Sequence, residues 1–169
     1  RLDEFYGLLR RGEDPGAAAA KVAAAAPDAP VLAAREWFDP IAEATLGSPE
    51  QTLASPVAAA QRLVAALEAA EADEARALAA EIRLVSPFSV VVALAQLARV
   101  RSLRLDLAGV LADDFRVLGR LTARADFAEG VRAQVIDKDG KPAWRPATLE
   151  EVDAAEIARI LDPEFERRF

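Results

Sequence analysis

Apolar residues recur along most of the chain at intervals of three and four positions, which is the spacing of one face of an α-helix. The clearest stripe of this kind has the following members: Leu107, Val110, Leu111, Leu118 and Leu121. Three charged residues of the same segment, Asp113, Arg116 and Arg120, lie mostly off the stripe. We therefore expect a helix whose apolar face lies in the protein core, in preference to the wall of a ligand site.

Many helix starts are marked by a dipeptide in which Asp or Ser stands directly before Pro. Asp and Ser are good N-cap residues, and Pro suits the first helical position because the amide that it lacks would have no partner there. The dipeptide occurs at these positions: Asp14-Pro15, Asp39-Pro40, Ser48-Pro49, Ser55-Pro56, Ser86-Pro87 and Asp162-Pro163. These positions predict where helices begin.

The apolar spacing and the start signals together predict a chain made of helices. The predicted ranges are Leu2 to Arg10, Pro15 to Ala25, Pro40 to Leu46, Pro56 to Ala70, Glu74 to Leu84, Pro87 to Val100, Leu107 to Arg124, Phe127 to Ile136 and Leu149 to Leu161. Gly47 predicts a stop after Leu46, and Pro27 and Pro30 predict a non-helical connector. The sequence shows no convincing strand signal, so the expected fold class is all-α.

A weak shift in composition near residues 46 to 56 predicts two parts of the chain. The first, residues 1–55, contains N-terminal helices and a linker. The second, residues 56–169, is a C-terminal helical domain. We expect Trp144, which stands between Pro142 and Pro146, to be a packing anchor, and Trp37 and Phe38 to anchor the connector from Pro30 to Pro40 in the same way.

Composition excludes several classes of function. The formal net charge of -7 argues against a nucleic-acid partner, which would require a basic face. The chain has no cysteine and no histidine, which excludes zinc-thiolate sites and nucleophilic mechanisms that use Cys or His. No run approaches the ~20 apolar residues of a membrane span, and no signal peptide is visible. A cytoplasmic location is therefore expected.

Two signals that resemble capping boxes flank a short turn near the C-terminus. Asp126 is followed three residues later by Glu129, and Thr148 is followed three residues later by Glu151. Arg132 lies one helical turn after Glu129 and is placed to pair with it. The acidic pairs Asp113-Asp114 and Glu150-Glu151 are sequence neighbours that cannot face each other on a helix, so a solvated surface is expected for them.

The turn between these signals carries the only candidate ligand site that the spacing suggests. Lys138, Lys141 and Arg145 surround it and could hold a phosphate through charge-assisted hydrogen bonds. The alternative is a solvated turn with cations near a helix C-terminus, which the helix dipole favours, and spacing alone favours this alternative. We find no glycine-rich phosphate loop and no spacing typical of metal ligands.

Three blocks of the sequence resemble a known family. They are SPFSVVVALAQL from Ser86, LDLAGVLADDFRV from Leu105, and DFAEGVRAQVIDKDGKPAWRPATLEEV from Asp126. In order and spacing they resemble the closing part of the 3-hydroxyisobutyryl-CoA hydrolase branch of the crotonase (enoyl-CoA hydratase/isomerase) superfamily. From Arg1 to Val85 the likeness is one of helical layout.

This resemblance implies that the chain is the helical C-terminal region of a crotonase-like α/β spiral fold whose core is absent here. In such enzymes the core supplies two peptide amides as an oxyanion hole, and in the hydrolase branch acidic residues of the core activate water. None of these motifs occurs in this sequence, so no catalytic residue is expected in the chain. Lys138 lines up with a lysine that can contact the CoA phosphates in crotonases. The expected CoA phosphate site is therefore Lys138 together with Lys141 and Arg145, which cluster around the same turn.

The implied function is hydrolysis of 3-hydroxyisobutyryl-CoA in valine catabolism by the full-length protein, with the chain alone inactive. Coenzyme A enters as part of the substrate, and no separate cofactor is implied. The expected partners are the acyl-CoA, the N-terminal crotonase core and further copies in a homo-oligomer. Two alternatives stay open, an enoyl-CoA hydratase or isomerase of the same superfamily and a non-catalytic helical interaction module. Because the sequence begins at Arg1 without methionine, we interpret it as part of a longer polypeptide.

Overall fold

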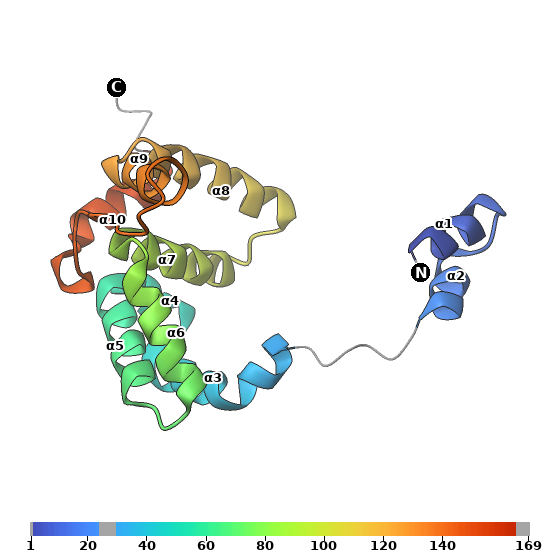
Figure 1. Cartoon of the computed structure of the whole chain (residues 1–169), viewed down its shortest axis with the longest axis horizontal. Coiled ribbons are helices and arrows are strands. Elements are labelled where there is room, and N and C mark those ends of the chain that lie inside the picture. The colour runs from blue at the N-terminus through green and yellow to red at the C-terminus, as the bar shows by residue number, and fades with distance from the viewer. Residues whose placement is uncertain (1, 24–29, 165–169) are drawn as a thin grey trace. The chain divides into compact units, whose positions relative to one another are not determined.

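The structure is a computed structural model that describes residues 2–23 and 30–164, and within these ranges it contains helices and no strand (Figure 1). The expected all-α fold class is therefore confirmed for the described residues. The chain divides into two compact units, a smaller one over Arg1–Glu36 and a larger one over Trp37–Phe169.

The smaller unit contains two short helices, α1 (Leu2–Arg10) and α2 (Pro15–Val22), which pack on each other and bury Leu8 and Ala18. The third helix, α3 (Pro30–Leu46), crosses the division between the units. The sequence placed a boundary between residues 55 and 56, whereas the structure divides the chain earlier, because α4 (Pro49–Ala54) packs on α7 (Pro87–Leu103). As a domain boundary of a full-length protein, the position at 55 stays a prediction.

The larger unit holds the remaining helices. They are α5 (Pro56–Ala69), α6 (Asp73–Leu84), α8 (Leu107–Thr122), α9 (Ala125–Val131), the π-helical turn η1 (Arg132–Ile136), the 3-10 turn η2 (Leu149–Glu151) and α10 (Ala154–Leu161). Most predicted helices are present with ends shifted by a few residues, whereas the predicted helix over Leu149 to Leu161 is split by residues 152–153. The predicted end of the second helix at Ala25 lies outside the described residues.

Local capping chemistry explains several of the helix starts. The side chains of Asp14, Ser48 and Ser86 accept hydrogen bonds from amides in the first turns of α2, α4 and α7. Ser55 precedes α5 without such a bond. Gly47 ends α3 in the left-handed conformation, as expected. A helix start at Asp162-Pro163 is not tested, because the described chain ends at residue 164.

The start predicted at Asp39-Pro40 is wrong, because α3 runs through this dipeptide from Pro30 to Leu46. The predicted non-helical connector is therefore helical from Pro30 onward, while Pro27 lies outside the described residues. Trp37 and Phe38 do act as packing anchors, since they lie against a cluster formed by α5 and α6. The short helix α4 was not predicted, although its start signal at Ser48 is present in the sequence.

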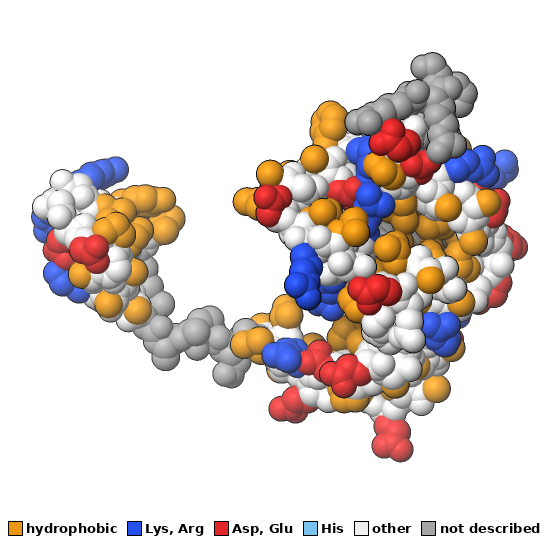
Figure 2. Space-filling view, turned by 180° about the vertical axis from the view of Figure 1, so that it is seen from behind, with side chains coloured by type: hydrophobic (Ala, Val, Ile, Leu, Met, Phe, Trp, Pro, Cys, Tyr) orange, Lys and Arg blue, Asp and Glu red, His pale blue; other side chains and the backbone are white. Residues whose placement is uncertain are grey.

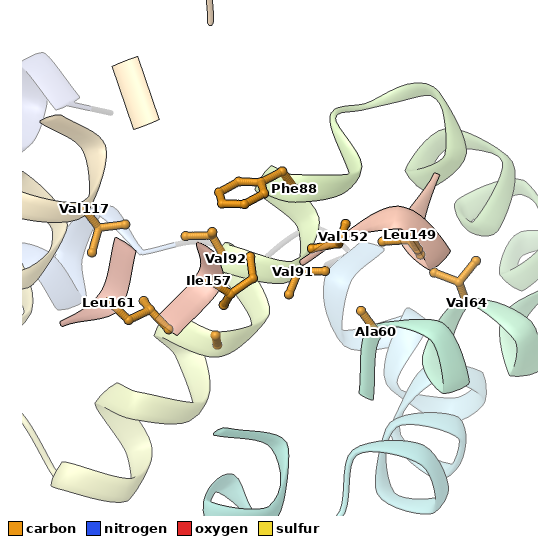
Figure 3. Packing of buried hydrophobic residues seen from close by; sticks show 11 residues of the cluster. Ala60, Val64, Phe88, Val91, Val92, Val117, Leu149, Val152, Ile157 and Leu161 are labelled. Carbon is orange, nitrogen blue, oxygen red and sulfur yellow. The ribbon is translucent and has the colours of Figure 1, made fainter. Parts of the chain in front are cut away.

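The main core of the larger unit is built around α7, which contributes more buried side chains to it than any other described helix. Phe88, Val91 and Val92 of α7 are fully buried and meet Val117 of α8 and Ile157 of α10 (Figure 3). On the other side of α7 the same cluster continues through the following residues: Ala60, Val64, Leu149 and Val152. Burying a side chain such as that of Phe88 contributes about 1.5–3 kcal/mol, so these residues fix α7 relative to α5, α8 and α10.

The stripe expected in the core of α8 is largely exposed. Leu107, Leu111 and Leu118 retain 74%, 59% and 56% of their accessible surface, and the side chain of α8 that is fully buried is Val117. The expectation of a buried stripe is therefore wrong for the described chain. Figure 2 shows hydrophobic side chains at the surface of the larger unit.

Candidate functional site

Lys138, Lys141 and Arg145 all lie in the exposed segment that follows η1. Among the described residues, none of the three side chains forms a hydrogen bond or an ion pair. Their backbone is nevertheless held: the amide of Arg145 donates to Asp126 at 2.9 Å, and that of Lys141 donates to Asp139 at 2.8 Å. The segment thus presents three cationic side chains from a fixed backbone, whereas their joint use as a phosphate site stays a prediction.

The backbone at Lys138 turns through the left-handed region, with φ of 55°, and Gly140 follows with φ of 64°. Non-glycine residues adopt this region only where the surroundings hold them in it. The holding bond is close by, since the amide of Gly140 donates to the carbonyl of Ala133 in η1 at 3.1 Å. This bond closes the turn and directs the chain back along η1.

Arg132 is the centre of the turn. Its guanidinium donates to both carboxylate oxygens of Glu129 at 2.9 and 2.8 Å, to Asp137 at 2.6 Å and to Asp139 at 2.7 Å. It also donates to the carbonyl of Lys141 at 3.2 Å. A planar guanidinium has five N–H donors in a fixed fork, so one side chain can tie both ends of the turn together. The predicted pairing of Glu129 with Arg132 is confirmed.

These contacts shift the acid–base equilibria of the turn. The Arg132 guanidinium, followed by the amide of Ala143, lowers the pKa of Glu129 from an ordinary value of 4.5 to about 2. Arg132 and the amide of Lys141 lower the pKa of Asp139 in the same way. Glu129 in turn, with Asp139 and Asp137, raises the pKa of Arg132. At neutral pH the carboxylates of Glu129 and Asp139 are therefore fully ionised and Arg132 is fully protonated, so their ion pairs persist.

Asp126 does not cap a helix, which corrects the first of the two expected capping boxes. The helix α9 begins at Ala125 after Arg124, so Asp126 lies inside its first turn. The carboxylate of Asp126 is buried and accepts hydrogen bonds from the Ser86 hydroxyl at 2.8 Å and the amide of Arg145 at 2.9 Å. It therefore joins the start of α7 to the cationic segment, while Glu129 reaches the amide of Ala143 at 2.7 Å instead of the helix start.

The second expected capping box is also wrong in its details. Thr148 precedes the short turn η2 but its side chain makes no capping bond there. Glu151 accepts a hydrogen bond from the amide of Ala147 at 2.9 Å, one residue before the position that a capping box requires. The hydrogen bond of Glu151 therefore stabilises the 3-10 turn η2 and does not start a long helix.

Trp144 anchors the cationic segment, as the sequence predicted. Its indole nitrogen donates to the carbonyl of Leu84 at the end of α6 at 2.9 Å, and its ring lies directly on Gly130 of α9. A Cβ atom at residue 130 would stand 3.1 Å from the ring, so a glycine there permits the contact. The role of Gly130 could not be predicted, since nothing in the spacing indicates which residue the ring meets.

Asp113 also differs from the sequence prediction, because it is buried and not solvated. It retains 7% of its accessible surface and forms ion pairs with Arg116 and, at 3.4 Å, with Arg99. Its neighbour Asp114 accepts a hydrogen bond from Gln96 at 3.1 Å. One oxygen of the buried Asp113 carboxylate pairs with arginines of α7 and α8, while the other, Oδ2, has no hydrogen-bond partner among the described residues. The arginines stabilise the charged form of Asp113, which is therefore part of a structural ion pair.

A groove of about 780 Å³ lies beside the cationic segment. Its apolar walls come from α7, α8, α9 and η1 and include Phe88, Leu118, Leu121, Phe127 and Val131. The Trp144 ring and the Ser86–Asp126 pair lie along it, so the groove and the anchored segment share one wall.

The described residues contain no cluster of three or more side chains suited to a metal ion. No single helix among them could span a membrane, although the bent pair of α6 and α7 passes by length and composition.

Comparisons with known proteins give a consistent result. The family model described as enoyl-CoA hydratase/isomerase matches residues 21–161. The mitochondrial 3-hydroxyisobutyryl-CoA hydrolase of Dictyostelium discoideum is 33% identical over 82 residues, which are 48% of this chain and 21% of that protein. The human protein of the same name is 40% identical over 76 residues, which are 45% of this chain and 19% of that protein.

A third relative is the 3-hydroxyisobutyryl-CoA hydrolase-like protein 5 of Arabidopsis thaliana, which is 43% identical over 58 residues. This match covers 32% of the chain and 15% of the relative. The matched segments thus cover only 15% to 21% of the length of these relatives. No solved structure matches the chain.

Proposed function

Because this chain belongs to the enoyl-CoA hydratase/isomerase family, we propose that it is the helical part of an acyl-CoA thioester hydrolase that acts on 3-hydroxyisobutyryl-CoA. The observation that carries the proposal is the shared name of the relatives, which are called 3-hydroxyisobutyryl-CoA hydrolases. The resemblance drawn from three sequence blocks is confirmed at the level of the family and its hydrolase branch.

The reaction requires groups that this sequence does not contain. Hydrolysis of a thioester needs donors that stabilise the oxyanion of the tetrahedral intermediate and a base that activates water. The chain has no histidine or cysteine, and its buried carboxylates Asp113 and Asp126 are engaged in ion pairs and hydrogen bonds. We therefore propose that the oxyanion hole and the acidic residues belong to a core outside the chain.

In this proposal the cationic segment contributes substrate binding. Lys138, Lys141 and Arg145 would donate to the phosphate groups of coenzyme A, whose negative charges match these side chains. The network around Arg132 supports this role because it fixes the backbone of Lys141 without engaging its ammonium group. A fixed backbone lowers the entropy that is lost when a flexible side chain binds.

The test is an assay of the full-length gene product with 3-hydroxyisobutyryl-CoA and with an enoyl-CoA of similar length. Hydrolysis releases free coenzyme A thiol, which a thiol reagent detects, whereas hydration removes the absorbance of the conjugated enoyl group. Thiol release from the first substrate is the expected result. Absence of thiol release from both substrates contradicts the hydrolase proposal.

Two alternatives have specific support. The description of the matching family favours an enoyl-CoA hydratase or isomerase, and loss of enoyl absorbance in the same assay would identify that activity. The absence of histidine and cysteine in the sequence favours a non-catalytic helical module, for which neither signal changes. Homo-oligomerisation and a cytoplasmic location stay predictions, and the names of the Dictyostelium and human relatives place those two proteins in mitochondria.

A further inference from the structure

The helix α8 turns its apolar face away from the rest of the unit. Leu107, Leu111, Phe115 and Leu118 retain 74%, 59%, 85% and 56% of their accessible surface. Their spacing of four, four and three residues places them on one side of the helix. Scattered apolar residues at a surface are ordinary, but four large ones aligned on one helix form a continuous face.

The opposite edge of α8 is charged and faces inward. Asp113 is buried between Arg116 and Arg99, and Val117 is the fully buried apolar side chain beside it. Arg120, one turn further on, donates at 2.7 Å to the carbonyls of Ile160 and Asp162 at the end of α10. These contacts fix the rotation of α8, so the helix cannot bury its apolar face in the core of this chain.

The groove described above extends the apolar face of α8. Leu118 belongs to both, and the groove adds other exposed apolar side chains, namely Leu84, Val85, Phe127 and Val135. Fully buried Phe88 lies in the same groove. The face and the groove together form one apolar surface that could pack against another folded body.

We propose that this surface, the apolar face of α8 with the adjoining groove, binds the catalytic core of the enzyme. The inference rests on the proposed function and specifies the surface through which the two parts meet. The relatives are about five times as long as the segment that matches, so a large folded part of each lies outside it. Such a part supplies enough apolar area to cover the surface, and the cationic segment, which shares a wall of the groove, is thereby brought to the edge of the core.

Site-specific photo-cross-linking in the full-length gene product tests this inference. Benzoylphenylalanine replaces Phe115, whose 85% exposure makes the change harmless to folding of the chain itself. The control position is Val31 in α3, which is 80% exposed and lies in the smaller unit. Peptide mapping then identifies the cross-linked segment, and thermal unfolding verifies that both labelled proteins are folded.

The expected result is a cross-link from residue 115 to a segment outside residues 1–169 that has an enoyl-CoA hydratase/isomerase sequence, with no such link from residue 31. A cross-link between residue 115 and a second copy of this chain overturns the inference, and so does the absence of any cross-link. A cross-link that persists unchanged when an apolar small molecule fills the groove would exclude the groove from the docking surface. The thiol-release assay on the unlabelled enzyme is independent, so a cross-link without activity removes the hydrolase proposal alone.

A pair of substitutions gives a second, functional test. Phe115→Asp places a charge on the apolar face, where burial against the core would leave it unpaired. We expect this variant to lower thiol release by about tenfold or more, whereas Val31→Asp leaves it unchanged. Equal activities in the two variants contradict docking through α8.

Discussion

At the scale of single residues, Lys138 offers the most direct test of the proposed substrate site. Its ammonium group is unengaged among the described residues, and its backbone is fixed at φ of 55° by the turn. Replacing it by alanine removes one charge-assisted bond to a phosphate, so we expect KM for the acyl-CoA to rise roughly tenfold with little change in kcat. Lys21→Ala in the smaller unit is the matched control and should leave KM unchanged.

A second prediction concerns Asp126, which joins the start of α7 to the cationic segment and does not cap a helix. Asp126→Ala leaves the Ser86 hydroxyl and the amide of Arg145 without their partner, which costs about 1–3 kcal/mol of unfolding free energy. Denaturant unfolding of Asp126→Ala, Ser86→Ala and the double variant measures the coupling. Because the two side chains share a bond, we expect the double variant to lose less than the sum of the two. Additive losses would show that they do not act together.

The capping box predicted from Asp126 and Glu129 shows how a local sequence pattern can give a wrong prediction. The spacing of Asp126 and Glu129 satisfied the rule for a capping box, but both carboxylates have partners that are more than ten residues away in sequence, the amides of Arg145 and Ala143. A rule based on residues three apart cannot weigh such distant partners. The i, i+3 pair of Glu129 and Arg132 was predictable because both residues lie on the same helical turn.

At the scale of elements, the turn around Arg132 should respond to acid. Glu129 has a folded pKa of about 2 against an ordinary value of 4.5, so its stabilising effect is complete above pH 4.5 and is lost as the pH falls toward 2. The lowered pKa of Asp139 acts in the same direction. In a Trp37→Phe background, Trp144 fluorescence should therefore change between pH 4.5 and 2. Glu129→Gln should show the low-pH signal already at neutral pH, and a wild-type profile in that variant contradicts the assignment.

Two glycines in helices make a matched pair. A Cβ atom at Gly119 of α8 has nothing within 4 Å, whereas one at Gly130 of α9 meets the Trp144 ring at 3.1 Å. Gly119→Ala should raise the unfolding free energy by up to about 1 kcal/mol through helix propensity alone. Gly130→Ala has the same gain but must displace the ring, so it should be the less stable of the two in thermal unfolding. Equal stabilities would mean that the ring moves without cost.

Most helices were predictable because their starts depend on neighbouring residues. Asp14 and Ser86 cap the helices that their sequence context predicted. The helix start predicted at Asp39-Pro40 was wrong because Trp37, Phe38 and Ile41 all pack on the cluster formed by α5 and α6, which keeps this part of α3 helical. Tertiary packing of this kind can outweigh the cost of a proline within a helix, about 3 kcal/mol, and a local rule does not include it. The helix α4, six residues long, was too short for an apolar period to be recognised.

At the scale of the whole molecule, the family and the all-α class could be predicted from sequence, whereas the role of α8 could not. Periodicity identifies the apolar face of a helix but not the body against which that face packs. The stripe from Leu107 to Leu121 was expected in the core, and the structure turns most of it outward because Asp113 and Arg120 are held on the inner side. A periodic stripe in part of a longer protein can therefore indicate an interface between its parts.

Two phenylalanines, one exposed on α8 and one buried in the core, allow an interface residue to be distinguished from a core residue by stability measurements on the chain itself. Phe115 is 85% exposed and Phe88 is 1% exposed. In the 169-residue chain produced alone, Phe115→Ser should change the unfolding free energy by less than about 0.5 kcal/mol, as for most surface substitutions. Phe88→Ala should lose about 3–5 kcal/mol because it leaves a cavity in the core around α7. Denaturant midpoints of both variants provide the measurement. A large loss for Phe115→Ser would mean that the chain covers α8 by itself, either by refolding it inward or by pairing with a second copy, and a dependence of the midpoint on protein concentration would separate these two cases.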